Sequence, residues 1–154
     1  MDIASLVAKA RQQFEEAKPA EQGILLGGEV VVARIWPLEG ADWRALKAKH
    51  PPRIKDGEML ASDAAYGFNL DGVVASYPRL VLIQDGAEVP IEAEQWAEVC
   101  TVLSGPDLDA LAMLVWGKNE YEPQQRLLAA GKALSGERAK KPASPENSAS
   151  PSES

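Results

Sequence analysis

A short helix closed by two prolines constrains the fold of this chain more than any other stretch. Residues 41–53 read ADWRALKAKHPPR, in which a tryptophan, a leucine and a lysine share one helical face. Two consecutive prolines cannot continue a helix, because proline has no N–H group and its ring collides with the preceding turn. We therefore expect a helix that is capped by Asp42 and ends near Lys49, followed by an extended segment through His50 to Arg53.

Positive charge surrounds this helix in a chain that is acidic overall. The formal net charge is −7, whereas this region carries the basic residues Arg44, Lys47, Lys49, Arg53 and Lys55. Such a group is either a solvated face beside a turn or a docking patch for an acidic partner, and both interpretations stay open. The negative charge of the whole chain argues against nucleic acid as a partner, since phosphate backbones are repelled.

Length and cysteine content limit the class of protein. A chain of 154 residues forms one domain with at most a tail, and such a domain buries about two thirds of its unfolded surface. The single cysteine, Cys100, excludes an intramolecular disulfide. No run approaches the roughly 20 apolar residues that cross a bilayer, and the first residues lack the features of a signal peptide. We expect a soluble, cytoplasmic protein with no membrane partner.

The N-terminal region predicts an amphipathic helix over residues 2–18. Its apolar residues recur at helical spacing on one side: Ile3, Leu6, Val7, Ala10 and Phe14. The helix must stop before Pro19. It either packs on the rest of the domain or serves as a lever that binds a partner.

A β-hairpin is predicted next, with strands at residues 24–26 and 29–36. The two residues between them, Gly27 and Gly28, readily adopt the positive φ angles of a tight hairpin turn. A two-stranded hairpin is marginal in water, so it must lie on helices or gain strands from another chain. Its edge is either covered or open to strand addition.

The middle of the chain is harder to interpret. Residues 54–65 are polar and predict a loop with a short helix, and a further helix begins near Asn69 with Gly72 as an unfavourable residue. Residues 79–84 are ambiguous, because a short run of apolar and β-branched residues fits a buried strand as well as a buried helix. Intrinsic propensity favours a strand there.

The C-terminal half predicts helices and then a tail. Apolar residues recur at helical spacing in residues 92–104 and again in residues 106–119, with only a short break between them. These two helices should form an antiparallel pair, and residues 124–134 predict a last helix. Residues 135–154 contain no large apolar side chain, so burial cannot offset their ordering entropy and we expect disorder.

Together these patterns predict an α+β fold that is mainly α-helical. The expected parts are an N-terminal amphipathic helix at residues 1–18, a hairpin with a small helical bundle at 19–134, and a disordered tail at 135–154.

The sequence offers little for catalysis. His50 has no second histidine or cysteine at ligand spacing, and Cys100 lies on an apolar helix face, where a buried and inert thiol is typical. A phosphate-binding loop is missing, since Gly131-Lys132 lacks the earlier glycine that such a loop needs. Paired acids at helix beginnings are explained by the helix dipole. We expect a protein that is not an enzyme, with no catalytic, cofactor or metal site.

Several short motifs follow one another in the order of a known family. They are Trp36-Pro37-Leu38, Gly40 to Leu46, His50-Pro51-Pro52-Arg53, Gly67-Phe68-Asn69, a helix with Trp96, and a helix that ends at Asn119. In this order the stretch from Gly23 to Asn119 resembles the tail assembly chaperones of long-tailed, siphovirus-like bacteriophages. In that family the segment corresponding to residues 79–84 tends to be helical, so the resemblance makes a helix our expectation there.

The resemblance implies a non-enzymatic chaperone of viral tail assembly. Such a protein binds the tape measure protein, keeps it soluble, helps recruit tail tube protein subunits, and leaves before the particle is complete. It acts in the host cytoplasm and is expected to be absent from the mature virion. The resemblance also implies a longer product made by a ribosomal frameshift near Lys140-Lys141 or Gly131-Lys132, and self-association with this long form or as a homo-oligomer.

The candidates for partner contact come from two places: the short helix with the segment that follows it, and the second strand of the hairpin. They are Trp43, Arg44, Lys47, His50, Arg53, Val30 and Val32. Charge reversal at Arg44 and Arg53 should weaken binding without unfolding the domain. Two alternatives stay open: a structural minor tail protein that persists in the virion, and a small adaptor or regulatory protein that docks an acidic partner.

Overall fold

The computed structural model describes residues 2–139, with the side chains of residues 2–136, and residues 1 and 140–154 lie outside this description. The chain divides into two compact units, Met1–Asn119 and Glu120–Ser154. The first unit combines a sheet with helices, and the second contains the helix α7 (Glu122–Ala139). The predicted fold class, α+β and mainly helical with an N-terminal helix and a hairpin, is confirmed.

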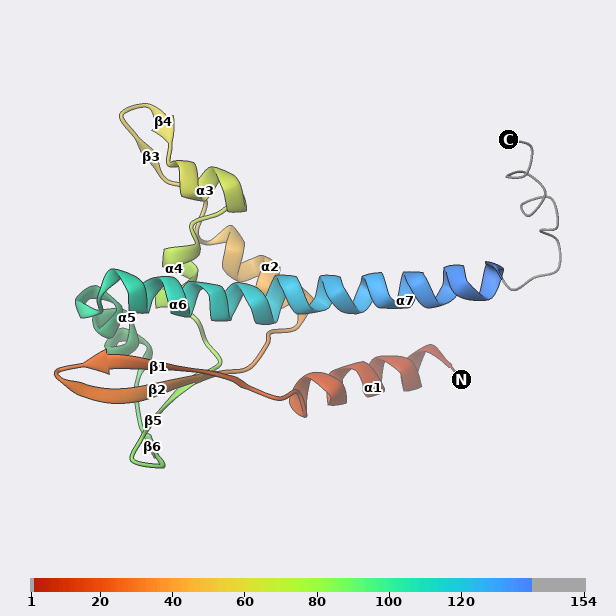
Figure 1. Ribbon diagram of the computed structural model, residues 1–154, viewed down its shortest axis with the longest axis horizontal. Coiled ribbons are helices and arrows are strands. Elements are labelled where there is room, and N and C mark those ends of the chain that lie inside the picture. The colour runs from red at the N-terminus through yellow and green to blue at the C-terminus, as the bar shows by residue number, and fades with distance from the viewer. Residues whose placement is uncertain (1, 140–154) are drawn as a thin grey trace, which may run out of the picture. The chain divides into compact units, whose positions relative to one another are not determined.

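A four-stranded antiparallel sheet forms the centre of the first unit (Figure 1). Its strands are β1 (Ala20–Leu26), β2 (Glu29–Ile35), β5 (Leu80–Gln84) and β6 (Ala87–Val89), in the order β1-β2-β5-β6. The predicted hairpin is β1 and β2, and its turn has φ angles of 60° at Gly27 and 82° at Gly28. The additional strands that this hairpin needs come from within the chain.

The strand β5 corrects our expectation of a helix at residues 79–84. Its residues pair with β2 in register, from Ile35 opposite Leu80 to Val32 opposite Ile83. The pairing buries Leu82 to 4% exposure and satisfies the backbone groups on the second side of β2. Asp85 and Gly86 then turn the chain into β6 with positive φ angles, as a tight hairpin requires. Propensity was therefore the better guide for this segment, and the helix implied by the resemblance was wrong.

Three helices pack with one face of the sheet around a single core. They are α4 (Leu70–Ala75), α5 (Ala93–Val102) and α6 (Gly105–Trp116). Alternate residues of β2 enter this core, namely Val31, Ala33 and Ile35, and Leu111 and Val115 of α6 belong to the same core. The helix α6 packs on β1 and α4, and α5 packs on α4. We expected α5 and α6 to form an antiparallel pair, but they share α4 as their main helical neighbour instead.

The short helix closed by the double proline is α2 (Gly40–Ala48), with Lys49 as its C-cap, as predicted. Its N-cap is Glu39 rather than Asp42, which lies in the first turn. The polar region after it contains a small hairpin, β3 (Ile54–Lys55) and β4 (Glu58–Met59), followed by α3 (Ala61–Tyr66).

The N-terminal helix α1 (Ile3–Glu15) forms as predicted, and its N-cap Asp2 accepts a hydrogen bond from the backbone N–H of Ser5 at 2.7 Å. None of its residues is buried, so it does not pack into the domain core. At the other end, a five-residue π-helix, η1 (Gly117–Tyr121), precedes α7.

The last helix extends beyond the predicted range of 124–134. Residues 135–139, which we expected to be disordered, belong to α7, and the remainder of that predicted tail, 140–154, lies outside the described residues. Ser135 and Gly136 are weak helix formers, but neither breaks a helix, and no proline follows until Pro142.

Candidate partner-binding surfaces

The aromatic residue of α2 is an anchor of the core. Trp43 is only 4% exposed, and its ring meets Phe68 edge to face, with 5.8 Å between the ring centroids. The ammonium group of Lys47 lies 5.5 Å from the centroids of both rings, a distance typical of cation–π contacts. Arg44, on the same helix, is exposed. Of the three candidate residues on α2, Trp43 is therefore buried, Lys47 lies against two aromatic rings, and Arg44 is exposed.

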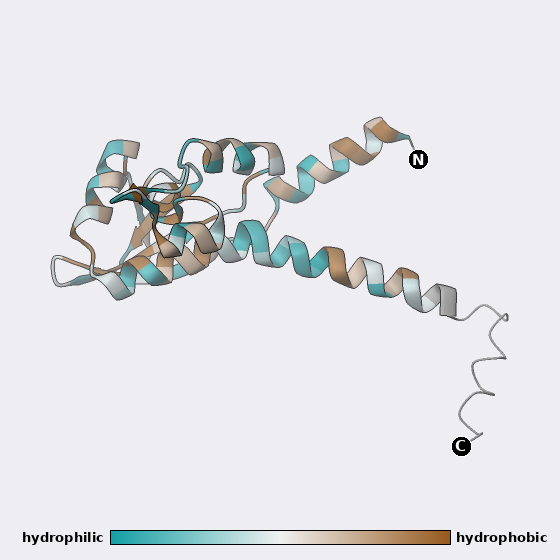
Figure 2. Ribbon diagram, turned by 90° about the horizontal axis from the view of Figure 1, so that it is seen from above, coloured by the Kyte–Doolittle hydropathy of each residue, from teal (hydrophilic) through white to brown (hydrophobic). Residues whose placement is uncertain are grey.

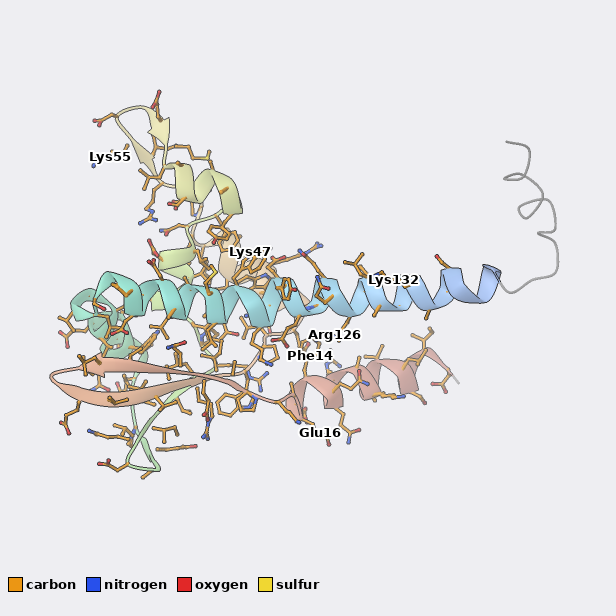
Figure 3. All side chains as sticks on the ribbon, viewed as in Figure 1. Phe14, Glu16, Lys47, Lys55, Arg126 and Lys132 are labelled. Atoms are coloured by element: carbon orange, nitrogen blue, oxygen red, sulfur yellow. The ribbon has the colours of Figure 1, made fainter. Side chains whose placement is uncertain are left out.

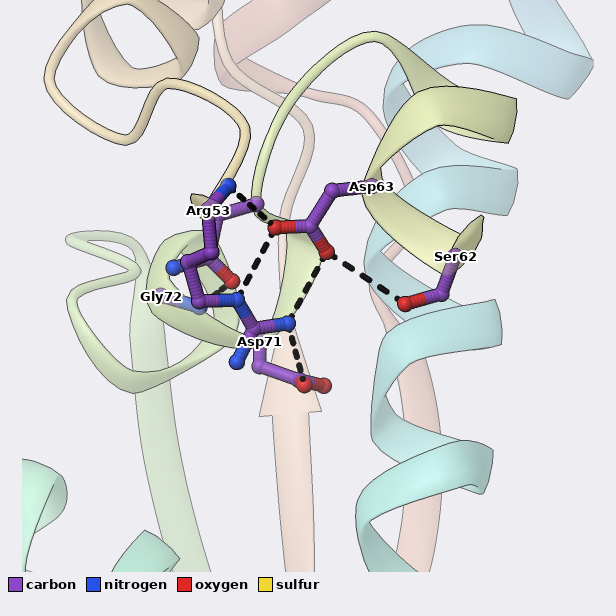
Figure 4. A network of polar contacts seen from close by, with 6 residues as sticks. Arg53, Ser62, Asp63, Asp71 and Gly72 are labelled. Carbon is purple, nitrogen blue, oxygen red and sulfur yellow. Dashed lines mark hydrogen bonds and ion pairs between the residues drawn. The ribbon is translucent and has the colours of Figure 1, made fainter. Parts of the chain in front are cut away.

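Arg53 belongs to a network of polar contacts that joins three elements (Figure 4). Its Nε and Nη2 atoms donate to the two carboxylate oxygens of Asp63 at 2.9 Å each, and its backbone N–H donates to Asp63 Oδ2 at 2.8 Å. Nη2 also donates to Asp71 at 3.1 Å. Asp63 is 2% exposed, so the pair fixes the chain before β3 onto α3 and α4.

These contacts favour the charged form of both partners. The hydrogen bonds from the Arg53 side chain lower the pKa of Asp63 to about 2, although burial acts in the opposite direction. The bonds from Arg53 to Asp63 in turn raise the pKa of the guanidinium group above its usual range. The charge of Arg53 is therefore largely neutralised within the domain, which weakens it as a contact for an acidic partner.

A pocket of about 420 Å³ lies beside this network. Arg53, Asp71 and Asp109 line its polar side, and Tyr66 and Met113 contribute apolar surface. Asp71 and Asp109 are exposed, so solvent screens the two carboxylates.

His50 connects the end of α2 to α4. Its Nε2 atom lies 2.8 Å from the hydroxyl oxygen of Ser76, and that hydroxyl donates to the carbonyl oxygen of Gly72 at 2.8 Å. The Ser76 hydroxyl thus lies within hydrogen-bonding distance of both the imidazole ring and a backbone carbonyl oxygen of α4, and it links the end of α2 to α4.

A second polar network is buried and was not predicted. The Asn119 side chain accepts from the backbone N–H of Leu38 at 2.9 Å and donates to the Tyr77 hydroxyl and the Val115 carbonyl oxygen, each at 2.9 Å. The Tyr77 hydroxyl donates to the carbonyl oxygen of Trp36 at 2.6 Å, and burial raises the pKa of Tyr77 to about 12. The network joins η1, which holds Asn119, and the end of α6 to the segment that leaves β2. The spacing of apolar residues in the sequence does not distinguish a buried asparagine at a helix end from an exposed one, so the role of Asn119 could not be predicted.

Val30 and Val32 lie on the face of the sheet opposite the core. Val30 is 67% exposed and stands opposite Leu25, which is 57% exposed. Val32 is paired with Gly23 on one side and with Ile83 on the other. Val81, two residues before Ile83 on β5, is paired with Arg34 on the same face. We call this set the open face: Leu25, Val30, Val32, Val81 and Ile83.

The free edge of β1 is partly satisfied within the chain. The backbone N–H of Leu25 donates to Asp107 of α6 at 3.1 Å, and the Gln22 side chain donates to the Gly23 carbonyl oxygen at 3.1 Å. These bonds, together with the packing of α6 on β1, leave this edge less suited to strand addition than the sequence suggested.

The seven predicted contact residues do not form one surface. The five between Trp43 and Arg53 belong to α2 and the segment after it, where Trp43 joins the core, whereas Val30 and Val32 lie on the open face.

Both terminal helices carry exposed apolar side chains, which the sequence pattern indicated only for the first. On α1, Ile3 is 74% exposed, with Leu6 and Val7 near 45%. On α7, the exposed leucines are Leu127, Leu128 and Leu134. Hydrophobic segments are visible on each helix in Figure 2, and Figure 3 draws the side chains of both, including Phe14 on α1 and Arg126 and Lys132 on α7.

The described part of the chain holds no candidate metal site and no candidate membrane span. Residues 2–139 contain no group of three acidic, histidine or cysteine side chains placed to hold a metal ion. Within the same residues, the helices are too short or too polar to cross a membrane.

These features define a mixed α+β protein with a four-stranded antiparallel sheet, helices on one of its faces, and a terminal helix in a unit of its own. Comparison with known proteins adds no relative, since no family model, no curated protein and no solved structure matches the chain.

Proposed function

We propose that this protein is a tail assembly chaperone of a long-tailed bacteriophage, which binds the tape measure protein, keeps it soluble and helps recruit tail tube subunits. The proposal rests on the resemblance of residues 23–119 to that family. The observation in the structure that supports it best is the exposed apolar surface of α7.

The helix α7 is an 18-residue element with leucines in contact with solvent. Leu127 is 74% exposed, Leu128 57% and Leu134 54%. Leu127 and Leu134 are seven residues apart and so share one side of the helix. Most of the stability of a helix in a protein comes from packing of its apolar face against another element. A client helix with an apolar stripe supplies such packing.

The charge of the chain suits a chaperone of an apolar client. A net charge of −7 keeps a complex with an aggregation-prone protein soluble through mutual repulsion between complexes. Among the basic residues, Arg44 is exposed and remains the candidate for contact with an acidic segment of a partner. Arg53 is held by Asp63 and Asp71.

Co-expression with the candidate tape measure protein, followed by fractionation and a pull-down, tests the proposal. We expect the tape measure protein to become soluble and to co-purify with this chain. The double variant Leu127→Glu, Leu128→Glu should abolish both effects, because carboxylates replace the apolar contact. The control Gln124→Glu, Gln125→Glu adds the same charge to exposed positions of the same helix and should bind normally.

The position of the protein in the finished particle gives an independent readout. A chaperone is present in infected cells and absent from purified virions on a protein gel. An insoluble, unbound tape measure protein together with this chain in purified virions would overturn the proposal in favour of a structural tail component.

A frameshifted longer product is part of the same proposal. The mRNA near the codons of Gly131-Lys132 or Lys140-Lys141 should contain a slippery heptamer, and a larger product that shares the N-terminal peptides should be found by mass spectrometry. An mRNA without such a heptamer would remove the long form from the list of partners.

A further inference from the structure

The pocket beside the Arg53 network lies within the first unit. Its walls come from α3, α4, α6 and the segment before β3. Its volume of about 420 Å³ falls in the range of roughly 300–1,000 Å³ that is usual for ligand pockets. The lining combines carboxylates with apolar side chains, so the pocket suits a ligand that is both charged and partly apolar.

The charged part of the lining is negative in sum. The carboxylates of Asp63, Asp71 and Asp109 line the pocket together with the guanidinium group of Arg53. Three negative charges against one positive charge leave a net charge of −2. A concave site with this charge attracts a cation and repels phosphate groups.

Two of the three carboxylates can accept further hydrogen bonds. Asp63 gives both oxygens to Arg53, whereas Asp71 accepts one bond from Arg53 through Oδ2 at 3.1 Å (Figure 4). Within residues 2–139, no donor binds the other oxygen of Asp71, and the side chain of Asp109 has neither a hydrogen bond nor an ion pair. Asp109 also lies beyond the first turn of α6, so the helix dipole does not explain its position.

The apolar part of the lining includes an aromatic ring that is held in place. Tyr66 is 37% exposed, and its ring lies against those of Phe68 and Trp116, with the centroids 6.3 and 6.2 Å away. Met113 of α6 adds an exposed apolar side chain. Because two aromatic neighbours already order the Tyr66 ring, a ligand that stacks on it loses little free energy to ordering.

We propose that this pocket binds an arginine side chain of a partner polypeptide. The guanidinium group pairs with the carboxylates of Asp71 and Asp109, and its flat face stacks on the ring of Tyr66. The methylene groups of the arginine lie along Met113, since long charged side chains cover apolar surface with their stems.

Arginine fits this lining better than other cations do. A guanidinium group is planar and carries five N–H donors in a fixed fork, so it pairs with carboxylates and stacks on an aromatic ring at the same time. The ammonium group of lysine is a compact, strongly hydrated charge without a flat face. A metal ion lacks a suitable set of ligands, because the described residues hold no three acidic, histidine or cysteine side chains placed to bind one.

Arginine binding at this pocket is independent of the proposed function. The pocket belongs to the first unit, whereas the proposed client contact uses the leucines of α7. Loss of arginine binding with normal solubilisation of the tape measure protein, or the reverse, therefore separates the two proposals.

Titration of the isotope-labelled full chain with short peptides, followed by nuclear magnetic resonance, tests the site. The probe is the tripeptide Gly-Arg-Gly with blocked ends, and two control peptides replace arginine by lysine or by citrulline, which keeps the shape without the charge. We expect the arginine peptide to shift the amide signals of Asp71, Asp109 and Met113 and to bind with a Kd of about 1 mM, as one side chain can supply. The lysine peptide should bind about threefold more weakly, and the citrulline peptide should cause no saturable shift.

Variants of the chain assign this binding to the pocket. Asp109→Asn removes one charge without disturbing the Arg53 network and should weaken binding of the arginine peptide about fivefold. Tyr66→Leu keeps apolar surface but removes the flat ring, and should weaken binding about threefold. The control Glu98→Gln removes the same charge from an exposed position of α5 outside the pocket and should bind normally. Circular dichroism with thermal unfolding verifies the fold of each variant.

The outcomes that would overturn the proposal are equally defined. They are an unmodified chain that shows no saturable shifts, a citrulline or lysine peptide that binds as tightly as the arginine peptide, and an Asp109→Asn chain that binds normally. Equal weakening by Asp109→Asn and Glu98→Gln would also overturn it, because the attraction would then come from the charge of the whole chain and not from this pocket.

Discussion

Arg53 and Asp63 form a two-pronged ion pair in which the carboxylate is 2% exposed and the guanidinium group is partly exposed. Both carboxylate oxygens receive a nitrogen of the Arg53 side chain at 2.9 Å, and the backbone N–H of Arg53 adds a third bond to the carboxylate. A buried carboxylate held in this way depends on its partner, because its desolvation is offset only while these bonds are made. A residue that sequence analysis assigned to partner binding is therefore a structural contact.

Arg53→Ala should destabilise the domain by about 3 kcal/mol, since removal of one partner leaves a buried charge without compensation. Chemical denaturation gives this free energy of unfolding. The control Arg44→Ala, at an exposed position of α2, should change stability by less than about 0.5 kcal/mol. Equal effects of the two substitutions would contradict the structural role of Arg53.

The same geometry corrects our expectation for charge reversal. Arg53→Glu places a second carboxylate beside Asp63 and should unfold the domain rather than only weaken binding. Arg44→Glu remains the clean test of the basic residues in partner contact, because Arg44 is exposed.

Stability should fall in acid as Asp63 is protonated. Its pKa is about 2 in the folded chain and 3.8 in the unfolded chain, so the unfolded state binds the proton more readily. The contribution of Asp63 is therefore fully present above about pH 4 and is lost as the pH falls through about 2. Asp63→Asn removes this titration and should flatten the curve of unfolding free energy against pH in that range. If the unmodified chain and Asp63→Asn lose stability in parallel as the pH falls, the acid sensitivity comes from other carboxylates.

The sequence predicted the elements whose signals are local. The hairpin turn at Gly27-Gly28, the helix closed by the double proline and the helix that begins after Asn69 all follow from neighbouring residues, and all three form. The strand at residues 80–84 is stabilised by pairing with β2, which lies more than 40 residues away in the chain. Local propensity favoured a strand there but did not exclude a helix.

The candidate contact residues show the same limit. A tryptophan on an amphipathic helix looks the same in sequence whether it enters the core or an interface, and Trp43 enters the core. Arg53 looked like part of one basic patch because its partners, Asp63 and Asp71, are separated from it in the chain. The open face was partly indicated, since Val30 and Val32 alternate with the buried residues of the same strand.

Asn119→Ala should cost roughly 2–3 kcal/mol of stability, because it leaves the buried backbone N–H of Leu38 without an acceptor. Tyr77→Phe should cost less, since the Asn119 amide then still donates to the Val115 carbonyl oxygen. The control Gln124→Ala removes an exposed amide and should be close to neutral. Unfolding midpoints of the three variants under one condition provide the comparison, and a neutral Asn119→Ala would exclude a structural role for the network.

Gly72→Ala should destabilise the domain, although the opposite is usual for a glycine inside a helix. Glycine ordinarily costs a helix about 1 kcal/mol relative to alanine. Here a Cβ atom at position 72 would lie 2.5 Å from Nδ1 of His50, so the ring that bonds to Ser76 must move. The same Cβ atom would lie 2.9 Å from Nδ2 of Asn69. If the closer contact with His50 is the main cause, the double variant His50→Ala, Gly72→Ala should be more stable than the sum of the two single changes predicts, because the loss of the ring removes that contact. Thermal unfolding of the four proteins in this cycle measures the coupling, and additive effects would show that the glycine serves another purpose.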